Sequence, residues 1–347
     1  GGTTINGGTT FSITISGVDL QAGGGVGHGL RITSANNEVR GLVINRFPVG
    51  SDLSLGGSGI YLGGPQAGNN RIYNNRIGTT ADGISAAPNA TYGVLLDNGA
   101  SNNDIGGTAA GQRNLLSGNA IADVGVIDET GNSQVIANNR IVGNFIGTNA
   151  AGTAAISGGP ANRTGGVFLG DYARGTLIRA NLIGGHTAGP TVAGITIFTS
   201  ATAIADSSVP RDTQILANDI GVTPTGTIIQ NRVGILLGSG VVGPLNTTIG
   251  DPLDPAAGRN AIGGNSVRGI EVRDTSFAIG DVTIVGNYIG LARNGTTIVG
   301  NGTAGATSGG EGIWIGQKSG ASPGAVTVGP ANVIAGSRSF HVRIRSG

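Results

Sequence analysis

The chain has 347 residues, of which 11% are charged, and its formal net charge is +1, so it presents no basic field for nucleic acid or an anionic membrane surface. Hydrophobic residues make up 38%, which argues against disorder, and the 68 glycines occur without a Gly-X-Y period, which excludes collagen. There is no cysteine for disulfide or thiol chemistry, and no apolar run approaches the length needed to cross a bilayer.

Short strands are predicted from the first residues onward. Apolar and polar residues alternate in Phe11–Ile15 and Leu30–Ile32, and Leu42–Ile44 is a short apolar run. These patterns indicate β-strands and not helices. The chain begins at Gly1 within a strand-like pattern and contains no Met. We therefore expect a processed or excised segment from which any signal peptide is already missing.

Two patterns then recur along the chain. The first, Ile-x-x-Asn-x-Ile-Gly, begins at Ile72, Ile141, Ile178, Ile215 and Ile284. The second, Gly followed by apolar-x-apolar, falls between copies of the first and begins at Gly29, Gly59, Gly93, Gly166, Gly194, Gly234, Gly269 and Gly312, with a degenerate member at Gly125. Such regular recurrence, with loops of variable length, identifies a repeat protein. Ile72 and Ile141 are 69 residues apart, as are Ile215 and Ile284, so two coils form a longer repeat.

These repeats predict a parallel β-helix of about ten coils, a single all-β domain over residues 1–347 that is uncapped at both ends. Each coil would stack its Ile, Val and Leu on the next coil, with strands about 4.8 Å apart. The repeated Asn would turn a corner in the left-handed conformation, and its amide would bond to the Asn one coil away. The Gly after the second Ile would allow a positive φ at the next corner.

Loops and additional strands are predicted between these repeats. Surface insertions are expected at 80–91, 148–165, 199–212, 222–231, 251–258 and 292–310. Three longer coils are expected to carry an additional strand, at Asp104–Gly107, Thr248–Asp251 and Val326–Gly329.

A family resemblance agrees with this fold. The Ile-x-x-Asn-x-Ile-Gly-Thr phrase at 141–148 and the Arg-Asn-Leu-Leu-Ser-Gly-Asn phrase at 113–119 resemble the Asn- and Gly-rich repeats of right-handed parallel β-helix proteins. These form the pectate-lyase-like superfamily, which includes large bacterial secreted and surface proteins. The resemblance covers nearly the whole chain and implies a right-handed β-helix. It does not specify an activity, because lyases, hydrolases, adhesins, phage tailspikes and structural modules share the fold.

Four carboxylates form the best candidate for chemistry. Asp97, Asp128, Glu129 and Asp171 follow the Gly-apolar strands of three consecutive coils. In register they would stack at one coil spacing, where like charges require a cation or raised pKa values. A polysaccharide hydrolase would use such a pair as acid and base, and a lyase would use it to bind calcium. The structural alternative is that these residues cap turns or pair with arginine.

The histidines indicate no site in the sequence. His28, His186 and His341 are far apart and show no metal-ligand spacing, so structural roles are expected for all three. No cofactor or metal is expected.

The middle residue of each Gly-apolar-x-apolar strand points outward if its neighbours point inward. Most of these outward residues are apolar, which indicates a covered or contacting surface. Either the chain's own insertions cover it, or it is a lateral interface formed by Tyr61, Leu95, Ile127, Phe168, Leu236 and Trp314.

We therefore expect an extracellular structural protein without catalysis, as a surface adhesin segment or a self-assembling fibre subunit. Its partners would be copies of itself, laterally and in a head-to-tail contact of Phe11, Ile13 and Ile15 with Phe340, Val342 and Ile344. The alternative is a polysaccharide lyase or hydrolase, or a carbohydrate-binding rod with Trp314 or Tyr61 as a sugar platform. A passive spacer within a longer surface protein also fits these features.

Overall fold

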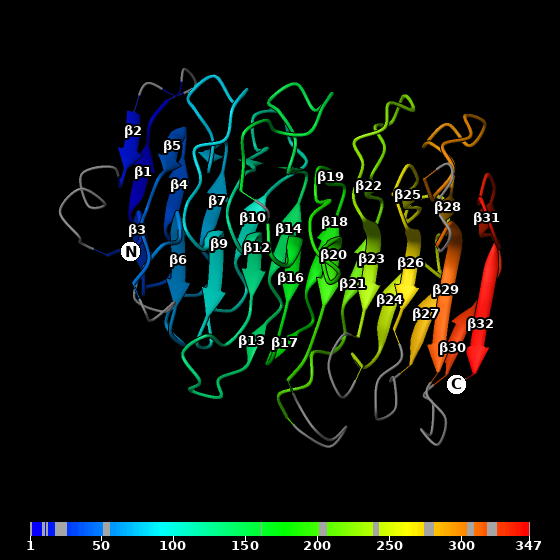
Figure 1. Ribbon diagram of the computed structural model, residues 1–347. Helices are drawn as coiled ribbons and strands as arrows, with labels where there is room; N and C mark the ends of the chain where they lie inside the picture. The colour runs from blue at the N-terminus through cyan, green and yellow to red at the C-terminus, as the bar shows by residue number, and fades with distance from the viewer. Residues whose placement is uncertain are drawn as a thin grey trace.

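The computed structural model describes residues 2–8, 11, 13–17, 26–50, 56–160, 162–200, 207–238, 243–273, 281–303, 309–317 and 325–346. Three parallel sheets, here called A, B and C, run the length of an elongated rod, and each has ten strands (Figure 1). Every coil supplies one strand to each sheet in turn, so the chain is a right-handed parallel β-helix, as the repeats predict. Within the described residues there is no helix long and apolar enough to cross a membrane.

The strands are short and lie in chain order within each sheet. Sheet A contains β1 (Thr4–Asn6), β4 (Glu38–Arg40), β7 (Arg71–Tyr73), β10 (Asp104–Gly106), β14 (Arg140–Val142), β18 (Leu177–Arg179), β21 (Gln214–Leu216), β24 (Thr247–Ile249), β27 (Val282–Ile284) and β30 (Val326–Val328). Sheet B contains β2 (Ile13–Ser16), β5 (Leu42–Asn45), β8 (Arg76–Ile77), β11 (Leu115–Leu116), β15 (Phe145–Ile146), β19 (Leu182–Ile183), β22 (Asp219–Ile220), β25 (Ala261–Ile262), β28 (Tyr288–Ile289) and β31 (Val333–Ile334). Sheet C contains β3 (Leu30–Ile32), β6 (Ile60–Gly63), β9 (Tyr92–Asp97), β12 (Ala122–Val126), β16 (Gly165–Leu169), β20 (Ala193–Ile197), β23 (Val233–Leu237), β26 (Arg268–Val272), β29 (Glu311–Gln317) and β32 (Val342–Ser346). A fourth, two-stranded sheet pairs β13 (Ile136–Ala137) with β17 (Ala173–Arg174).

One continuous apolar core fills the rod. Inward residues of neighbouring coils stand in register, as Ile105 does between Ile72 and Ile141 in sheet A. The predicted additional strands are therefore ordinary members of sheet A: β10, β24 and β30 each occupy the regular place. The prediction of an extra strand is wrong, because an insertion follows β10 and β24 and separates them from the corner Asn that would identify them.

Buried asparagine amides line the three corners as ladders, each Nδ2 donating to the Oδ1 of the Asn one coil further on. The first ladder is Asn37, Asn70, Asn103 and Asn139. The second is Asn75, Asn114, Asn144, Asn181, Asn218, Asn260, Asn287 and Asn332. The third contains Asn89, Asn119, Asn231, Asn265 and Asn301. The predicted ladder of the repeated Asn is thus confirmed as the second ladder, and the other two corners carry ladders that were not predicted.

The left-handed residue at the corners differs from the prediction. The ladder asparagines themselves do not have a positive φ, whereas the residue before many of them does: φ is 54° at Asn74, 56° at Ala180 and 57° at Ala217. The ladder Asn therefore keeps a strand-like backbone that directs its amide into the stack. The predicted positive φ of the Gly after the second Ile is confirmed in four of the five copies, with 83° at Gly78 and 75° at Gly147, and is wrong at Gly184, where Gly185 has the positive φ instead.

Four of the insertions form small flaps on sheet B, each closed by an antiparallel bridge. They are flap 1 (78–87), flap 2 (147–156), flap 3 (221–229) and flap 4 (290–299). They occur on alternate coils and project from the rod at the top of Figure 1. The other predicted insertions also lie between strands, although 201–206 and 304–308 are outside the described residues.

Candidate functional site

The predicted carboxylates lie together at the ends of β9, β12 and β16, but each accepts hydrogen bonds from other groups of the chain. Asp97 is fully buried, and its carboxylate accepts hydrogen bonds from the Tyr61 hydroxyl at 3.1 Å and from the Glu129 backbone N–H at 3.0 Å. Burial raises the pKa of Asp97 to about 6, the hydrogen bond from Tyr61 opposes this shift, and the charge of Asp128 adds to it.

The other three acidic residues also accept hydrogen bonds from the chain. Asp128 accepts from the Thr130 hydroxyl at 2.9 Å and from the Ser133 backbone at 2.7 Å. Glu129 accepts from the Tyr92 hydroxyl, and Asp171 accepts from the Thr199 hydroxyl at 2.7 Å. Within the described residues, no three His, Asp or Glu side chains are grouped so that they could hold a metal ion. Asp128 thus caps its own turn, whereas Asp97, Glu129 and Asp171 accept hydrogen bonds from neighbouring coils.

The outward face of sheet C is covered by the chain itself. Tyr61, Leu95, Phe168 and Leu236 are buried, packing in clusters with side chains such as Phe198 and Val267. These four residues therefore do not form an exposed lateral interface.

Two further residues of that predicted interface differ in another way. Ile127 is misplaced, because Gly125 occupies the register position between Leu95 and Phe168. Trp314 is half-buried, and the Arg268 guanidinium lies over its ring at 4.6 Å. The ring of Tyr61, the other predicted sugar platform, stacks on His28 with 4.6 Å between centroids.

A groove crosses the middle of the rod because two of the flaps do not meet. Flap 1 bonds to flap 2, where the backbone N–H of Ala150 donates to the Gly83 carbonyl at 2.9 Å. Within the described residues no hydrogen bond joins flap 2 to flap 3. The coil between them carries no flap, and a hollow of about 500 Å³ lies there, lined by residues 153–156, 158–160, 185–188 and 228–230.

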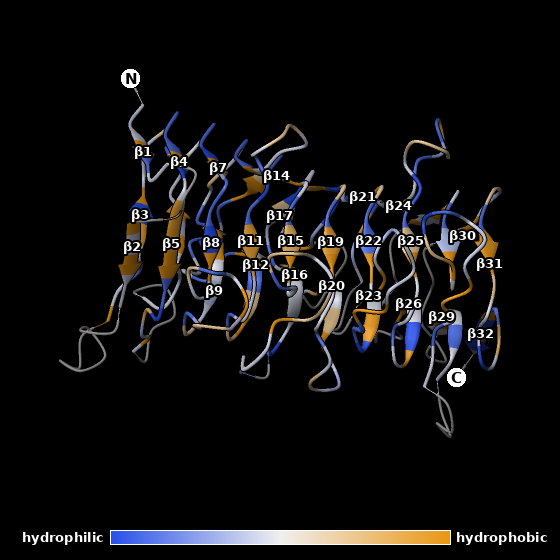
Figure 2. Cartoon of the chain, turned by 90° about the horizontal axis from the view of Figure 1, so that it is seen from above, coloured by the Kyte–Doolittle hydropathy of each residue, from blue (hydrophilic) through white to orange (hydrophobic). Residues whose placement is uncertain are grey.

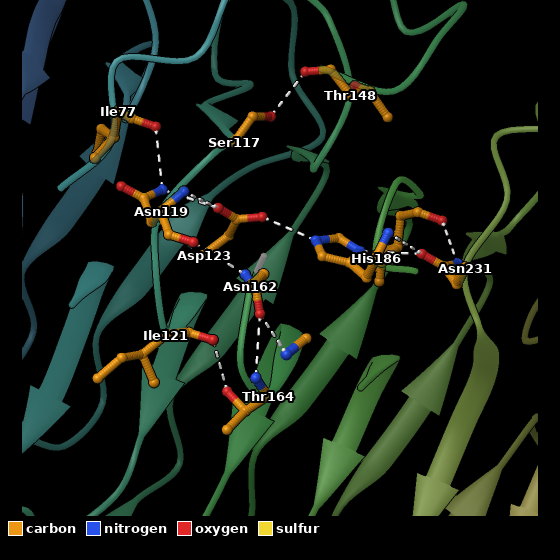
Figure 3. A network of polar contacts seen from close by, with 12 residues as sticks. Ile77, Ser117, Asn119, Ile121, Asp123, Thr148, Asn162, Thr164, His186 and Asn231 are labelled. Carbon is orange, nitrogen blue, oxygen red and sulfur yellow. Dashed lines mark hydrogen bonds and ion pairs between the residues drawn. The ribbon is translucent and has the colours of Figure 1, made fainter. Parts of the chain in front are cut away.

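A buried pair of residues, Asp123 and His186, lies at the floor of this hollow and interrupts the third ladder (Figure 3). The Asp123 carboxylate and the His186 ring are 3.0 Å apart, and the two residues are 0% and 3% exposed. Asp123 accepts from the Asn119 amide at 2.8 Å, and the other ring nitrogen of His186 is 3.0 Å from the Asn231 amide oxygen. The pair thus connects the two halves of the ladder.

The local sequence explains why a charged pair stands here. Asp123 occupies the place that Gly93 and Gly166 hold in the neighbouring coils. The coil between Asn119 and His186 offers no ladder amide, because the Asn162 oxygen accepts from the backbone of Thr164 and Gly165 in its own turn. The Asp123 side chain supplies the missing connection. A Cβ at Gly166 would lie 2.8 Å from the His186 ring, so glycine there makes room for the imidazole.

A second hollow, of about 340 Å³, adjoins the first and shares Thr153 with it. Its lining includes Asp219 from β22 and Phe145 from β15. Arg293 of flap 4 donates to Asp219 at 2.8 Å. Burial raises the pKa of Asp219 to about 6, although the positive charge of Arg293 opposes the shift. Together the two hollows form one groove between flaps 2 and 3.

Sequence reasoning missed Asp123 and gave His186 a structural role only. The sequence pattern aligns the degenerate coil on Gly125, whereas strand register places Asp123, two residues earlier, at the position of the repeat glycine. The signal that would have found the site is an aspartate in the place of the repeat glycine, two coils before a histidine in the place of the corner Asn.

Comparisons with known proteins find one distant likeness among solved structures and no family. No protein-family model matches the sequence, and no curated protein matches it. Among solved structures, the chain is similar to the Dettilon tailspike protein (gp208), with 15% sequence identity and a TM-score of 0.37 over 86% of this chain. The chain spans only about half, 54%, of that tailspike chain. A likeness this distant carries no functional argument, so what is established is the architecture: three parallel sheets wound as a right-handed β-helix.

Proposed function

We propose that the chain is a structural rod of an extracellular assembly, as a segment of a surface adhesin or as a self-assembling fibre subunit. The observation that carries this proposal is the exposure of core-type residues on the terminal coils. Phe340 is 53% exposed and Ile344 is 71% exposed, whereas the residues paired with Ile344 further along sheet C are buried. Unpaired strand edges with apolar side chains favour pairing with a further β-strand.

The sheet order changes the expected joint. Residues 13–16 form β2 at the edge of sheet B, and residues 342–346 form β32 at the edge of sheet C. A continuous head-to-tail stack therefore joins β32 of one copy to β3 of the next copy, and β31 to β2. The direct pairing of Phe11, Ile13 and Ile15 with Phe340, Val342 and Ile344 is wrong for such a stack, because the two segments belong to different sheets.

Negative-stain electron microscopy and light scattering test self-assembly. We expect filaments whose axial repeat is roughly 48 Å, because ten coils stack at about 4.8 Å each. Ile344→Asp should abolish them, since a charge at the joint would be buried against the next copy. Leu253→Asp is the matched control, because Leu253 is 94% exposed in a side loop away from both ends. Monomers alone at every concentration would contradict the fibre and leave the single adhesin rod.

Salt provides a second test of the same joint. In the outward row of sheet C, Arg31 pairs with Tyr61 at one end and Arg343 pairs with Trp314 at the other. A head-to-tail stack brings Arg343 of one copy beside Arg31 of the next, so like charges oppose association. Screening weakens this repulsion, with a Debye length of about 3 Å at 1 M salt against about 10 Å at 0.1 M. Assembly should therefore strengthen as salt rises, and weaker assembly in high salt would argue against this joint.

A second candidate function, saccharide binding, is favoured by the groove between flaps 2 and 3. Its lining is uncharged apart from the Asp123–His186 pair, Asp219 and Arg113, and it mixes hydroxyl, amide and apolar groups. Hydroxyl-rich, uncharged ligands suit such a surface.

Calorimetric titration with cellotetraose, maltotetraose and xylotetraose tests this candidate. Thr153→Trp would fill the place that the two hollows share and should weaken binding about tenfold or more. Ile84→Trp is the matched control, because Ile84 follows the glycine of flap 1 as Thr153 follows that of flap 2. Equal binding by both variants, or no binding of any tetrasaccharide at millimolar concentration, would exclude the groove as a saccharide site.

A further inference from the structure

The third ladder has a fixed direction. Asn89 donates through Nδ2 to Asn119 at 2.9 Å, and Asn231 donates in the same way to Asn265 at 3.2 Å. The Nδ2 of Asn231 also donates to the Ile183 carbonyl at 3.1 Å. The oxygen of the Asn231 amide must therefore face back along the ladder, toward His186, where it acts as an acceptor.

At the interruption, the Asp123 carboxylate faces both ladder neighbours with acceptor oxygens and has no N–H to donate. Its Oδ1 accepts from the Asn119 amide, and its Oδ2 lies 3.0 Å from His186 Nε2. On the other side of the ring, His186 Nδ1 lies 3.0 Å from the Asn231 oxygen, which also accepts from the His186 backbone N–H at 3.2 Å. Both ring nitrogens thus face acceptors. Hydrogen-bond accounting requires one proton on Nδ1 and a second proton between Nε2 and the carboxyl group.

We propose that Asp123 and His186 form a proton-dependent latch at mid-rod, in which one shared proton joins the two halves of the third ladder and its loss opens the corner beneath the groove. This inference does not depend on the proposed function. Without the shared proton, a carboxylate oxygen and an imidazole lone pair face each other at the same short distance, both buried and both without a donor. Such an unsatisfied buried pair is costly, and water from the adjoining hollow would relieve it by separating the coils.

Among the described residues around the pair, no other ionisable group can replace the shared proton. The described residues of flap 2, of β16 and of 184–192 carry no charge apart from His186 itself. Arg232 follows the next ladder rung, but its guanidinium donates to the Pro190 carbonyl at 2.9 Å. Among the residues that line the hollow, Asp123 and His186 are the titratable ones. Arg163, which precedes β16, is not part of that lining.

Nuclear magnetic resonance of the intact chain tests the latch. The sequence contains three histidines, so the His186 ring signals are distinguishable from those of His28 and His341. At about pH 5 we expect both His186 nitrogens to carry or share a proton, and titration toward about pH 9 should remove one. The amide of Arg232, which donates to the His186 carbonyl at 2.7 Å, reports opening of the corner.

Hydrogen exchange gives the quantitative signature. The protection factor of the Arg232 amide should fall by up to about tenfold per pH unit between the titration midpoints of the open and closed forms and level off above the midpoint of the closed form, as linkage to one proton requires. The amide of Asn181, which donates to Asn218 in the second ladder at 3.0 Å, should keep its protection factor. A pH-independent protection factor at Arg232 would overturn the proposal.

Two variants make the test specific. In Asp123→Asn the new amide can donate to a neutral His186 ring, so the corner should stay closed at high pH and open at low pH, which reverses the sign of the pH dependence. Asp123→Asn combined with His186→Asn restores a one-way amide ladder, and its protection should not vary with pH. If Asp123→Asn keeps the wild-type sign, the latch is wrong.

Discussion

The guanidinium group of Arg113 lies over the ring of Phe145 in the next coil, 3.9 Å from the ring centroid, while its Nε donates to the Gly143 carbonyl at 3.3 Å. Arg259 repeats this arrangement over Tyr288, at 4.1 Å, and donates to the Gly286 carbonyl at 2.8 Å. Each arginine directly precedes a rung of the second ladder. The two arginines are four coils apart, and each fastens an inserted loop onto the following coil.

Arg259→Lys should lower the free energy of unfolding by about 1 kcal/mol, because lysine loses both the planar stacking and the directed Nε hydrogen bond. Urea unfolding monitored by circular dichroism measures the change. Arg345→Lys, on the exposed side of β32, is the control and should stay within about 0.5 kcal/mol of the wild type. Equal effects of the two substitutions would show that the stacked geometry contributes nothing.

Asn181→Ala should be among the most destabilising single substitutions in the rod. The Asn181 side chain accepts from Asn144, donates to Asn218 at 3.0 Å and donates to the Ile141 carbonyl at 2.8 Å. Removing it leaves buried groups without partners on both neighbouring coils, at a cost of about 3 kcal/mol or more.

Thermal and urea unfolding measure this loss. Asn132→Ala, in an exposed loop, should change the free energy of unfolding by less than about 0.5 kcal/mol. A loss below about 1 kcal/mol for Asn181→Ala would mean that water replaces the missing amide inside the stack.

The buried carboxyl of Asp97 makes stability depend on pH. Its pKa is raised to about 6 in the folded state from 3.8, so the folded protein holds this proton more tightly than the unfolded chain does. The contribution is present below the unfolded pKa and is lost as pH rises through about 6, for a total of roughly 3 kcal/mol. Asp219 acts in the same direction.

Urea unfolding at about pH 4 and pH 7.5 tests this dependence. Asp97→Asn keeps the shape and the acceptor oxygen and should flatten the slope, whereas Asp254→Asn, in an exposed loop, should leave it unchanged. A wild-type protein that gains stability over the same rise in pH would contradict the sign.

Thr213→Val should stabilise the rod by about 1 kcal/mol. The first ladder ends at Asn139, and the buried residues that continue its line are Thr176, Thr213 and Thr247, whose hydroxyls have no hydrogen-bond partner. Replacing such a hydroxyl by a methyl group of similar shape removes a desolvated polar group. Thr196→Val is the control and should destabilise, because the Thr196 hydroxyl donates to the Thr164 carbonyl at 2.7 Å. Destabilisation by both substitutions would contradict the interpretation.

The fold could be predicted because its cause is periodic. Each coil repeats the same inward Ile or Val and the same corner Asn, and Figure 2 shows hydrophobic segments recurring along strands such as β2, β5 and β11. The prediction failed where an insertion divides a repeat. Residues 107–113 separate Ile105 from Asn114, so β10 looked like an extra strand.

The candidate site was harder to predict, since it consists of departures from the repeat. Asp123 replaces a glycine, His186 replaces an asparagine, and the coil that carries His186 has no flap. Single departures of this kind resemble ordinary variation in one sequence. Their meaning depends on register, which brings Asp123 and His186 within hydrogen-bond distance although they are 63 residues apart.

The one-way direction of the asparagine ladders gives the rod an electrical polarity. In all three ladders the amide groups point their donor end toward the C-terminal coils. Aligned amide dipoles add, as peptide dipoles do along a helix, so the two ends of the rod differ in sign of partial charge. Rods that join head-to-tail keep their dipoles aligned, whereas rods that meet through identical ends oppose them. Any filament built from this chain by head-to-tail stacking would therefore have two chemically distinct ends, and growth at one of them would differ from growth at the other.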